Sequence, residues 1–113
     1  MNARTLCDLA APLTALVALE ARFSHLPAPC VNVTTIYPDR LELSFHYDDF
    51  AAFEVWCEAL GMSPADVEHR VQGNGTTAVR IVHGHFAGAD TWLVGYAAIP
   101  ALEPVAAGSG AVS

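Results

Sequence analysis

The chain has 113 residues, which is room for one domain, and its 53% share of hydrophobic residues is enough to form a core. Twelve acidic residues against five arginines and no lysine give a net charge of −7, which argues against direct binding to nucleic acid because that binding depends on basic side chains. Three widely spaced cysteines, and the lack of an apolar run of the roughly 20 residues that a membrane span needs, predict a cytoplasmic protein with no disulfide framework and no contact with a membrane.

The first predicted element is a helix over residues 8 to 23. Asp8 is a candidate N-cap, and apolar side chains recur after it at helical spacing. Pro27 and Pro29 then favour extended backbone and end the helix. The apolar stripe of this helix consists of Leu9, Leu13, Leu16, Val17 and Phe23.

Residues 31 to 46 change to a period of two and predict a hairpin. Leu41, Leu43 and Phe45 alternate with polar residues in the second of its strands. Pro38 presets the backbone for a type I turn between the two strands.

A second helix is predicted to begin after Asp48 or Asp49, either of which can cap it. Gly61 supplies the left-handed conformation that ends it. Capping explains the two aspartates without an acid–base role, and Cys57 is expected to pack in the core rather than to act as a nucleophile. The apolar stripe consists of Phe50, Phe53, Trp56, Cys57 and Leu60.

Two alternating runs on either side of Gly73-Asn74-Gly75 predict another hairpin, whose register depends on the length of its loop. A three-residue loop sets Glu68 opposite Arg80, and we favour it for that ion pair. The alternative, a two-residue loop, would instead place Val79 and Ile81 on the face that carries Glu68.

A last hairpin is predicted to turn at Gly88-Ala89, where a Gly-X pair suits a type II′ turn. This turn pairs Ile81 with Tyr96. The expected fold is therefore a two-layer α+β domain with two helices on a mainly antiparallel five-stranded sheet, in the order α-β-β-α-β-β-β. It spans residues 1–99, and the Ala-, Pro- and Gly-rich residues 100–113 are expected to form a flexible tail.

The two faces of the predicted sheet differ in what they carry. We expect both helices to cover the face with Val79, Ile81, Trp92, Val94 and Tyr96. The other face then leaves a set of apolar side chains for a protein partner or a second copy of the chain. The expected interaction residues are Arg80, Val82, Phe86 and Leu93.

His83 and His85 form the one candidate metal site. Side chains two residues apart on a strand point to the same side, as metal ligands in β-proteins do. A third ligand is needed, and the alternative is that these rings pack against Trp92 and Val94. No nucleotide-binding or nucleophile motif is present, so no cofactor is expected.

The segment Leu26-Pro27-Ala28-Pro29-x-Val31, followed by Phe53-Glu54-x-Trp56-x-x-Ala59-Leu60-Gly61 and a closing hairpin, resembles small uncharacterised α+β proteins of actinobacteria. The resemblance covers residues 24 to 96. It implies a structural role for these positions and no activity.

Three hypotheses of function follow. The first is a non-enzymatic module that binds a protein partner or itself. The second is a small metal-binding protein or metal-dependent enzyme that uses His83 and His85. The third is an acidic mimic of nucleic acid that occupies a DNA-binding partner. The net charge is the feature that supports this hypothesis.

Overall fold

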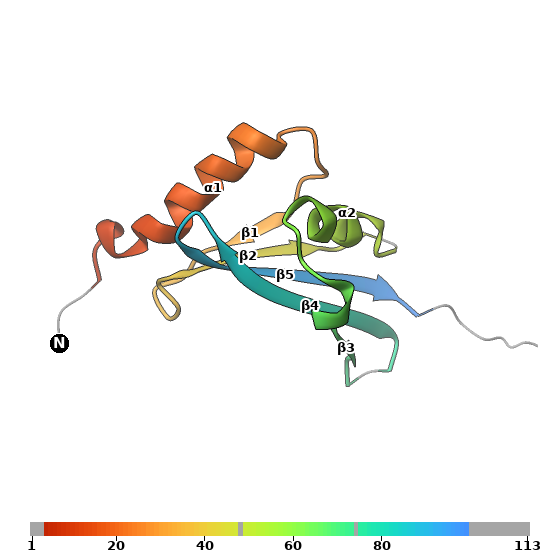
Figure 1. Ribbon diagram of the computed structural model, residues 1–113. Coiled ribbons are helices and arrows are strands. Elements are labelled where there is room, and N and C mark those ends of the chain that lie inside the picture. Colours follow the sequence, from red (N-terminus) through yellow and green to blue (C-terminus); the bar gives the residue numbers. More distant parts are fainter. Residues whose placement is uncertain (1–3, 48, 74, 100–113) are drawn as a thin grey trace, which may run out of the picture.

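The computed structural model describes residues 4–47, 49–73 and 75–99 and shows an α+β domain with the predicted order of helices and strands (Figure 1). The predicted tail over residues 100–113 lies outside the described residues, as does Asp48. The helical elements are η1 (Leu6–Leu9), α1 (Ala10–Phe23), α2 (Ala51–Ala59) and η2 (Pro64–Asp66). The strands are β1 (Cys30–Asn32), β2 (Arg40–Phe45), β3 (Glu68–Val71), β4 (Thr77–Phe86) and β5 (Ala89–Ala98).

The five strands form one sheet in the order β1-β2-β5-β4-β3. β2 and β5 run parallel, while β1 with β2, β3 with β4, and β4 with β5 run antiparallel. The sheet is therefore mainly antiparallel as predicted, but it is mixed, because β2 and β5 form one parallel pair. A parallel pair needs a long connection, and α2 with the β3–β4 hairpin provides it.

α1 begins two residues later than the sequence predicts. Asp8 does not cap α1; it closes a capping box on η1, where its Oδ2 accepts a hydrogen bond from the backbone N–H of Thr5 at 2.9 Å. α1 then buries Ala15 and Leu19 against the sheet, while Val17 stays exposed.

α2 starts and stops where the sequence predicts. The N-cap residue is Phe50 rather than Asp49, but Asp49 lies just before it, and its Oδ1 accepts a hydrogen bond from the N–H of Ala51 at 2.9 Å. Gly61 has φ +70°, and the N–H of Met62 bonds to the carbonyl of Cys57 at 2.9 Å, as in a Schellman motif. The helix buries its apolar stripe through Phe53, Trp56 and Cys57.

The turn at Pro38 is also confirmed, because the N–H of Arg40 bonds to the carbonyl of Tyr37 at 3.0 Å. The hairpin around it is looser than predicted. β1 ends at Asn32, so a loop over residues 33–39 separates it from β2.

Both later hairpins differ from the predicted register. β3 pairs with β4 so that Arg70 faces Val79 and Glu68 faces Ile81, which is the arrangement of the alternative loop; the expected Glu68–Arg80 pairing is wrong. Arg80 instead finds its carboxylate on α2, in Glu54 at 3.2 Å.

The β4–β5 turn lies at Ala87-Gly88, one residue earlier than predicted. Both residues take positive φ, +50° and +87°. Two positive φ values in a two-residue loop are typical of a type I′ turn, which matches the twist of the strands. Ile81 consequently pairs with Val94, not with Tyr96.

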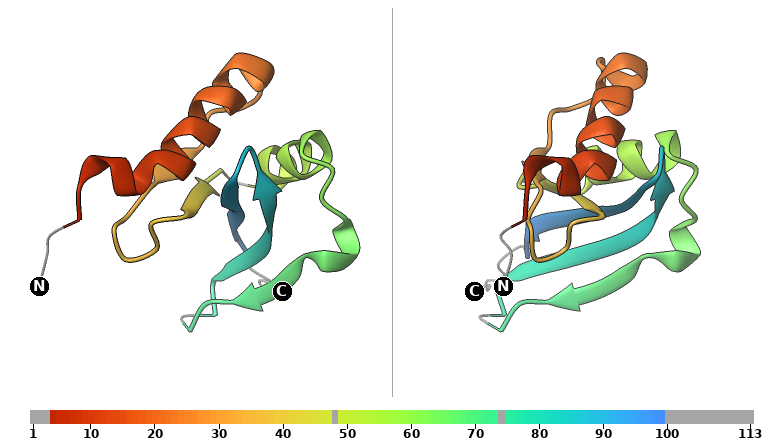
Figure 2. Two further views of the ribbon diagram at one scale, coloured as in Figure 1. Left: turned by 60° about the vertical axis from the view of Figure 1, so that its left-hand side comes forward. Right: turned by 90° about the vertical axis from the view of Figure 1, so that its left-hand side faces the viewer.

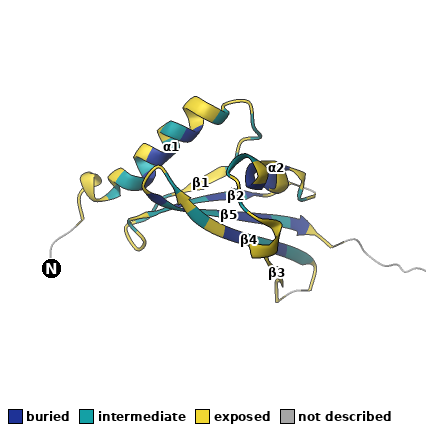
Figure 3. Cartoon of the chain, in the orientation of Figure 1, coloured by how far each residue is buried: buried dark blue, intermediate teal, exposed yellow. Residues whose placement is uncertain are grey.

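Both helices lie on one face of the sheet, and the structure reverses which face that is (Figures 1 and 2). The covered face carries Val82 and Leu93, both buried in the core beneath the helices (Figure 3). Trp92 and Tyr96 alternate with Leu93 along β5 and so lie on the opposite face, the side of the sheet away from α1 and α2 (Figures 1 and 2). The prediction of the two faces was therefore wrong.

Room for a helix explains the reversal. A Cβ added to Gly95 would lie 3.0 Å from the side chain of Phe53, so α2 fits closely only where the sheet carries small residues. β2 favours the same covered face, since its parallel register places the buried Leu43 beside Leu93 and Phe45 beside Gly95.

No helix in the described part of the chain has the length and hydropathy needed to cross a membrane.

Candidate functional site: the open face of the sheet

The interaction residues expected from the sequence do not form a surface patch. Val82 and Leu93 are core residues, 2% and 0% exposed. Phe86 packs against Phe23 of α1, with ring centroids 6.4 Å apart. Arg80 is half-buried, lies over the ring of Phe50 at 4.1 Å and pairs with Glu54. The docking surface expected on that face is therefore wrong, because these residues belong to the core and to its edge.

The two candidate metal ligands have other surroundings. His83 stacks on Trp92 with ring centroids 4.4 Å apart and an interplanar angle of 12°. Its Nδ1 lies 4.0 Å from Asp90 Oδ1, while His85 is exposed. Among the described residues, no group of three or more His, Cys, Asp and Glu side chains is arranged to hold a metal ion.

The face without helices, called here the open face, is the most distinctive surface of the domain. Three of its strands, β2, β5 and β4, contribute alternate side chains, because residues two apart on a strand share a side. The register aligns Glu42 with Trp92 and His83, and Ser44 with Val94 and Ile81. The open face consists of Arg40, Glu42, Ile81, His83, Trp92, Val94 and Tyr96.

A stack of planar groups occupies one end of the open face. The guanidinium carbon of Arg40 lies 4.0 Å from the ring centroid of Tyr37 and 4.2 Å from that of Trp92. His83 stacks on Trp92 in turn. Tyr37, Arg40, Trp92 and His83 thus form a continuous series of ring and cation contacts.

The acidic neighbour of this stack is already engaged. Asp90 Oδ2 accepts a hydrogen bond from the indole N–H of Trp92 at 3.0 Å. Arg40 forms no ion pair within the described residues, and its Nε is the single side-chain nitrogen or oxygen among them that is buried without a hydrogen-bond partner. The guanidinium is positioned by the two rings rather than by a carboxylate.

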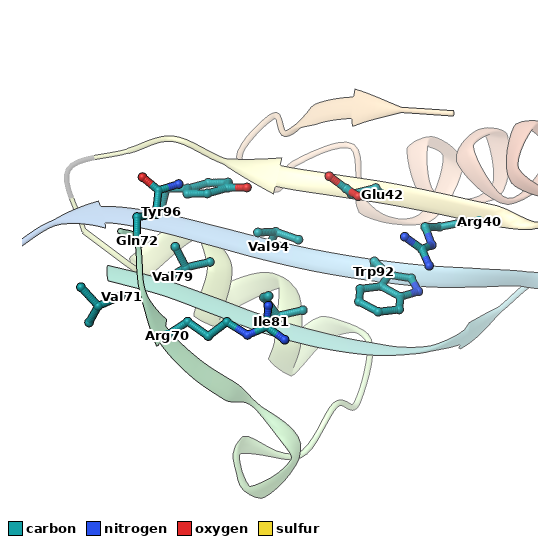
Figure 4. Close-up of a pocket in the computed structure, with 10 residues that line it drawn as sticks. All are labelled: Arg40, Glu42, Arg70, Val71, Gln72, Val79, Ile81, Trp92, Val94 and Tyr96. Carbon is teal, nitrogen blue, oxygen red and sulfur yellow. The ribbon is translucent and has the colours of Figure 1, made fainter. Parts of the chain in front are cut away.

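The opposite end of the face is also aromatic. His46 stacks on Tyr96 with centroids 4.5 Å apart and an angle of 10°. Arg70 of β3 forms an ion pair with Glu68, and Figure 4 shows its side chain lying towards Ile81.

A shallow hollow of about 430 Å³ runs between these two ends (Figure 4). Val94 and Val79 form its floor and are nearly buried, although no helix covers them, because longer side chains flank them. Its lining consists of Arg40, Glu42, Arg70, Val71, Gln72, Val79, Ile81, Trp92, Val94 and Tyr96. The arrangement can take an apolar group in the middle and a charged group at the Arg40 end.

A second hollow, of about 600 Å³, lies on the other side of the sheet between α2 and β3. Arg80, the one arginine in its lining, is already paired with Glu54. Burial, with the charge of Glu54, raises the pKa of the Cys57 thiol on its wall from 9.0 to about 11. The thiol is therefore protonated at neutral pH and is a poor nucleophile.

Sequence reasoning missed Arg40 and Tyr37 altogether. A signal was present, because Pro38 sets a turn that returns the chain within three residues and so brings side chains on either side of it together. Trp92 could not be joined to them from the sequence, since the β2–β5 pairing is between distant segments.

The chain was also compared with protein-family models, with curated proteins and with solved structures, and none of the three comparisons finds a match.

Proposed function

We propose that this protein is a non-enzymatic interaction module that binds a protein partner on the open face of its sheet. The observation that supports this most is the strip formed by Ile81, Trp92, Val94 and Tyr96, which lies on the side of the sheet away from both helices.

The composition of the open face agrees with a protein interface. Tryptophan, tyrosine and arginine are the residues most enriched among those that dominate binding energy. Trp92, Tyr96 and Arg40 lie on one surface here, with apolar side chains between them and charged side chains at the border. Trp92 stacks on His83 and Tyr96 stacks on His46, so these two rings lose little side-chain freedom on binding.

Photo-crosslinking in the native host tests the proposal. The photoreactive residue p-azidophenylalanine is placed at Tyr96 on the open face. The matched control carries it at Tyr47, an exposed aromatic residue outside the lining of the hollow, whose hydroxyl donates to the carbonyl of Ala28.

We expect a defined protein product from position 96 that does not form from position 47. The substitution Trp92→Ala in the same chain should reduce its yield. No product at position 96, or the same products at both positions, would contradict the proposal.

A further inference from the structure

We infer that Arg40 is the anion-recognition residue of the open face, and that the protein partner places an aspartate or glutamate carboxylate on it, beside an apolar residue in the central hollow. This inference rests on the proposed function, because it names the chemistry of the partner at the same site.

The first step is that Arg40 is held ready for a ligand. Two rings lie against its guanidinium, Tyr37 at 4.0 Å and Trp92 at 4.2 Å from the guanidinium carbon. These contacts restrict the group and leave recognition to its edge, where the N–H groups are. Arg40 thus pays little entropy when it binds a planar anion.

The second step is that no acidic residue in the described part of the chain forms an ion pair with this cation. The other two arginines of the sheet are paired, Arg70 with Glu68 and Arg80 with Glu54. Asp90, the nearest candidate by register, is bonded to the indole of Trp92. Arg40 has no such carboxylate among the described residues, and its buried Nε has no acceptor. The chain itself covers the Nε, so the terminal N–H groups at the edge of the guanidinium are the ones left for an acceptor outside the chain.

The third step is the choice of ligand. A guanidinium with a fixed plane binds carboxylate or phosphate through parallel hydrogen bonds. The hollow that starts at Arg40 continues over Trp92, Val94 and Ile81, which favours an apolar side chain next to the charge. Acidic and apolar residues side by side in a protein segment supply both groups, and Glu42 at the border disfavours a second negative charge nearby.

Nuclear magnetic resonance titration is the direct test, because the protein is small, at 12.0 kDa, and weak binding is measurable. The probes are two acetylated, amidated tripeptides, Leu-Asp-Leu and Leu-Asn-Leu, which differ in one charge. Inorganic phosphate serves as a third probe, which separates carboxylate from phosphate recognition.

We expect Leu-Asp-Leu to shift the Arg40 Nε–H and Trp92 Nε1–H signals, and Leu-Asn-Leu to bind about tenfold more weakly or not at all. The Nε1–H of Trp56, which is bonded to the carbonyl of Pro27 at 2.8 Å away from the open face, is the internal reference and should stay in place.

Variants sharpen the test. Arg40→Gln should abolish the difference between the two peptides, and Arg40→Lys, which keeps the charge without the planar fork, should bind Leu-Asp-Leu with intermediate strength. Arg22→Gln is the matched control, since Arg22 also lies over two rings, Phe23 and Phe86, but on the other side of the sheet. It should bind as the unaltered protein does.

Each of these results would overturn the inference: equal shifts with both peptides, undiminished binding by Arg40→Gln, or a response to phosphate alone. A dimer in solution that persists in Arg40→Gln would also overturn it, by placing a second copy on the face. A partner crosslinked at Tyr96 without any selectivity for Leu-Asp-Leu would support the proposed function and reject carboxylate recognition by Arg40. Selectivity for Leu-Asp-Leu without a crosslinked partner would support carboxylate recognition and reject the proposed function.

Discussion

At the scale of single residues, close contacts and unusual backbone angles define where the chain tolerates change. Gly95 is the clearest case, because the sheet and α2 meet there with no room for a side chain. Ala87 is the second, because it holds a positive φ of +50° without being glycine.

Gly95→Ala should destabilise the domain by about 1–3 kcal/mol, because the new Cβ would lie 3.0 Å from Phe53, which is packed in the core. Chemical unfolding in urea measures the change. Gly84→Ala is the matched control on the neighbouring strand: its nearest atom is the flexible end of Met62 at 3.5 Å, an ordinary contact. An equal loss in both variants would mean that close packing of α2 is not the cause.

Ala87→Asn should stabilise the domain by roughly 0.5–1 kcal/mol, because asparagine tolerates the left-handed conformation better than alanine does. The midpoint of thermal unfolding reports this change. Ala98→Gly, which places a glycine in extended backbone on the same hairpin, should act in the opposite direction. A loss of stability in Ala87→Asn would argue against a type I′ turn.

The Cys57 thiol gives a prediction about pH. Its pKa is raised to about 11 when folded, from 9.0, so the folded state holds the proton more tightly than the unfolded state. The stabilising contribution is complete below pH 9 and declines as pH rises from 9 towards 11. Urea unfolding at the two ends of this range should show a larger loss of stability in the unaltered protein than in Cys57→Ala. Equal losses would show that the thiol titrates normally.

At the scale of elements, the extended segment after α1 is fastened to α2 by side chains rather than by the sheet. The indole N–H of Trp56 donates to the carbonyl of Pro27 at 2.8 Å, and the hydroxyl of Tyr47 donates to that of Ala28 at 2.8 Å. The proline-rich segment and the aromatic stripe of α2 are therefore in direct contact.

Trp56→Phe should lose about 1–3 kcal/mol of stability, because it leaves a part-buried carbonyl unsatisfied and removes core contacts with Phe23 and Phe45. Tyr47→Phe removes an equally short bond at an exposed position and should cost less. Urea unfolding of both variants makes the comparison. A larger loss in Tyr47→Phe would contradict the assignment of Trp56 as the main fastening of this segment.

At the scale of the whole molecule, β5 joins the parts. It pairs with β2 on one side and β4 on the other, and both helices pack over the face that it shares with them. Far-ultraviolet circular dichroism and the fluorescence of Trp56 and Trp92, which lie on opposite sides of the sheet, should therefore report one coincident unfolding transition. Separate transitions would show that the surroundings of the two tryptophans, in α2 and in β5, do not unfold together with the rest of the domain.

The sequence by itself determined the fold class and the element order, and it determined local features: the stop of α2 at Gly61, the turn at Pro38 and the start of α2 after Asp49. Each depends on neighbours in the chain, where φ preferences and short hydrogen bonds decide.

Only the tertiary structure decided which face the helices cover and which strand lies beside β5. Alternating strands offer two faces of similar apolar content, so the pattern alone does not choose between them. The choice falls to fit: the helices lie where Gly95 leaves space for Phe53 and where the wholly apolar side of β2 continues the core. The candidate site follows from this choice, because Arg40 and Trp92, 52 positions apart in the numbering, meet on the face that the helices leave free.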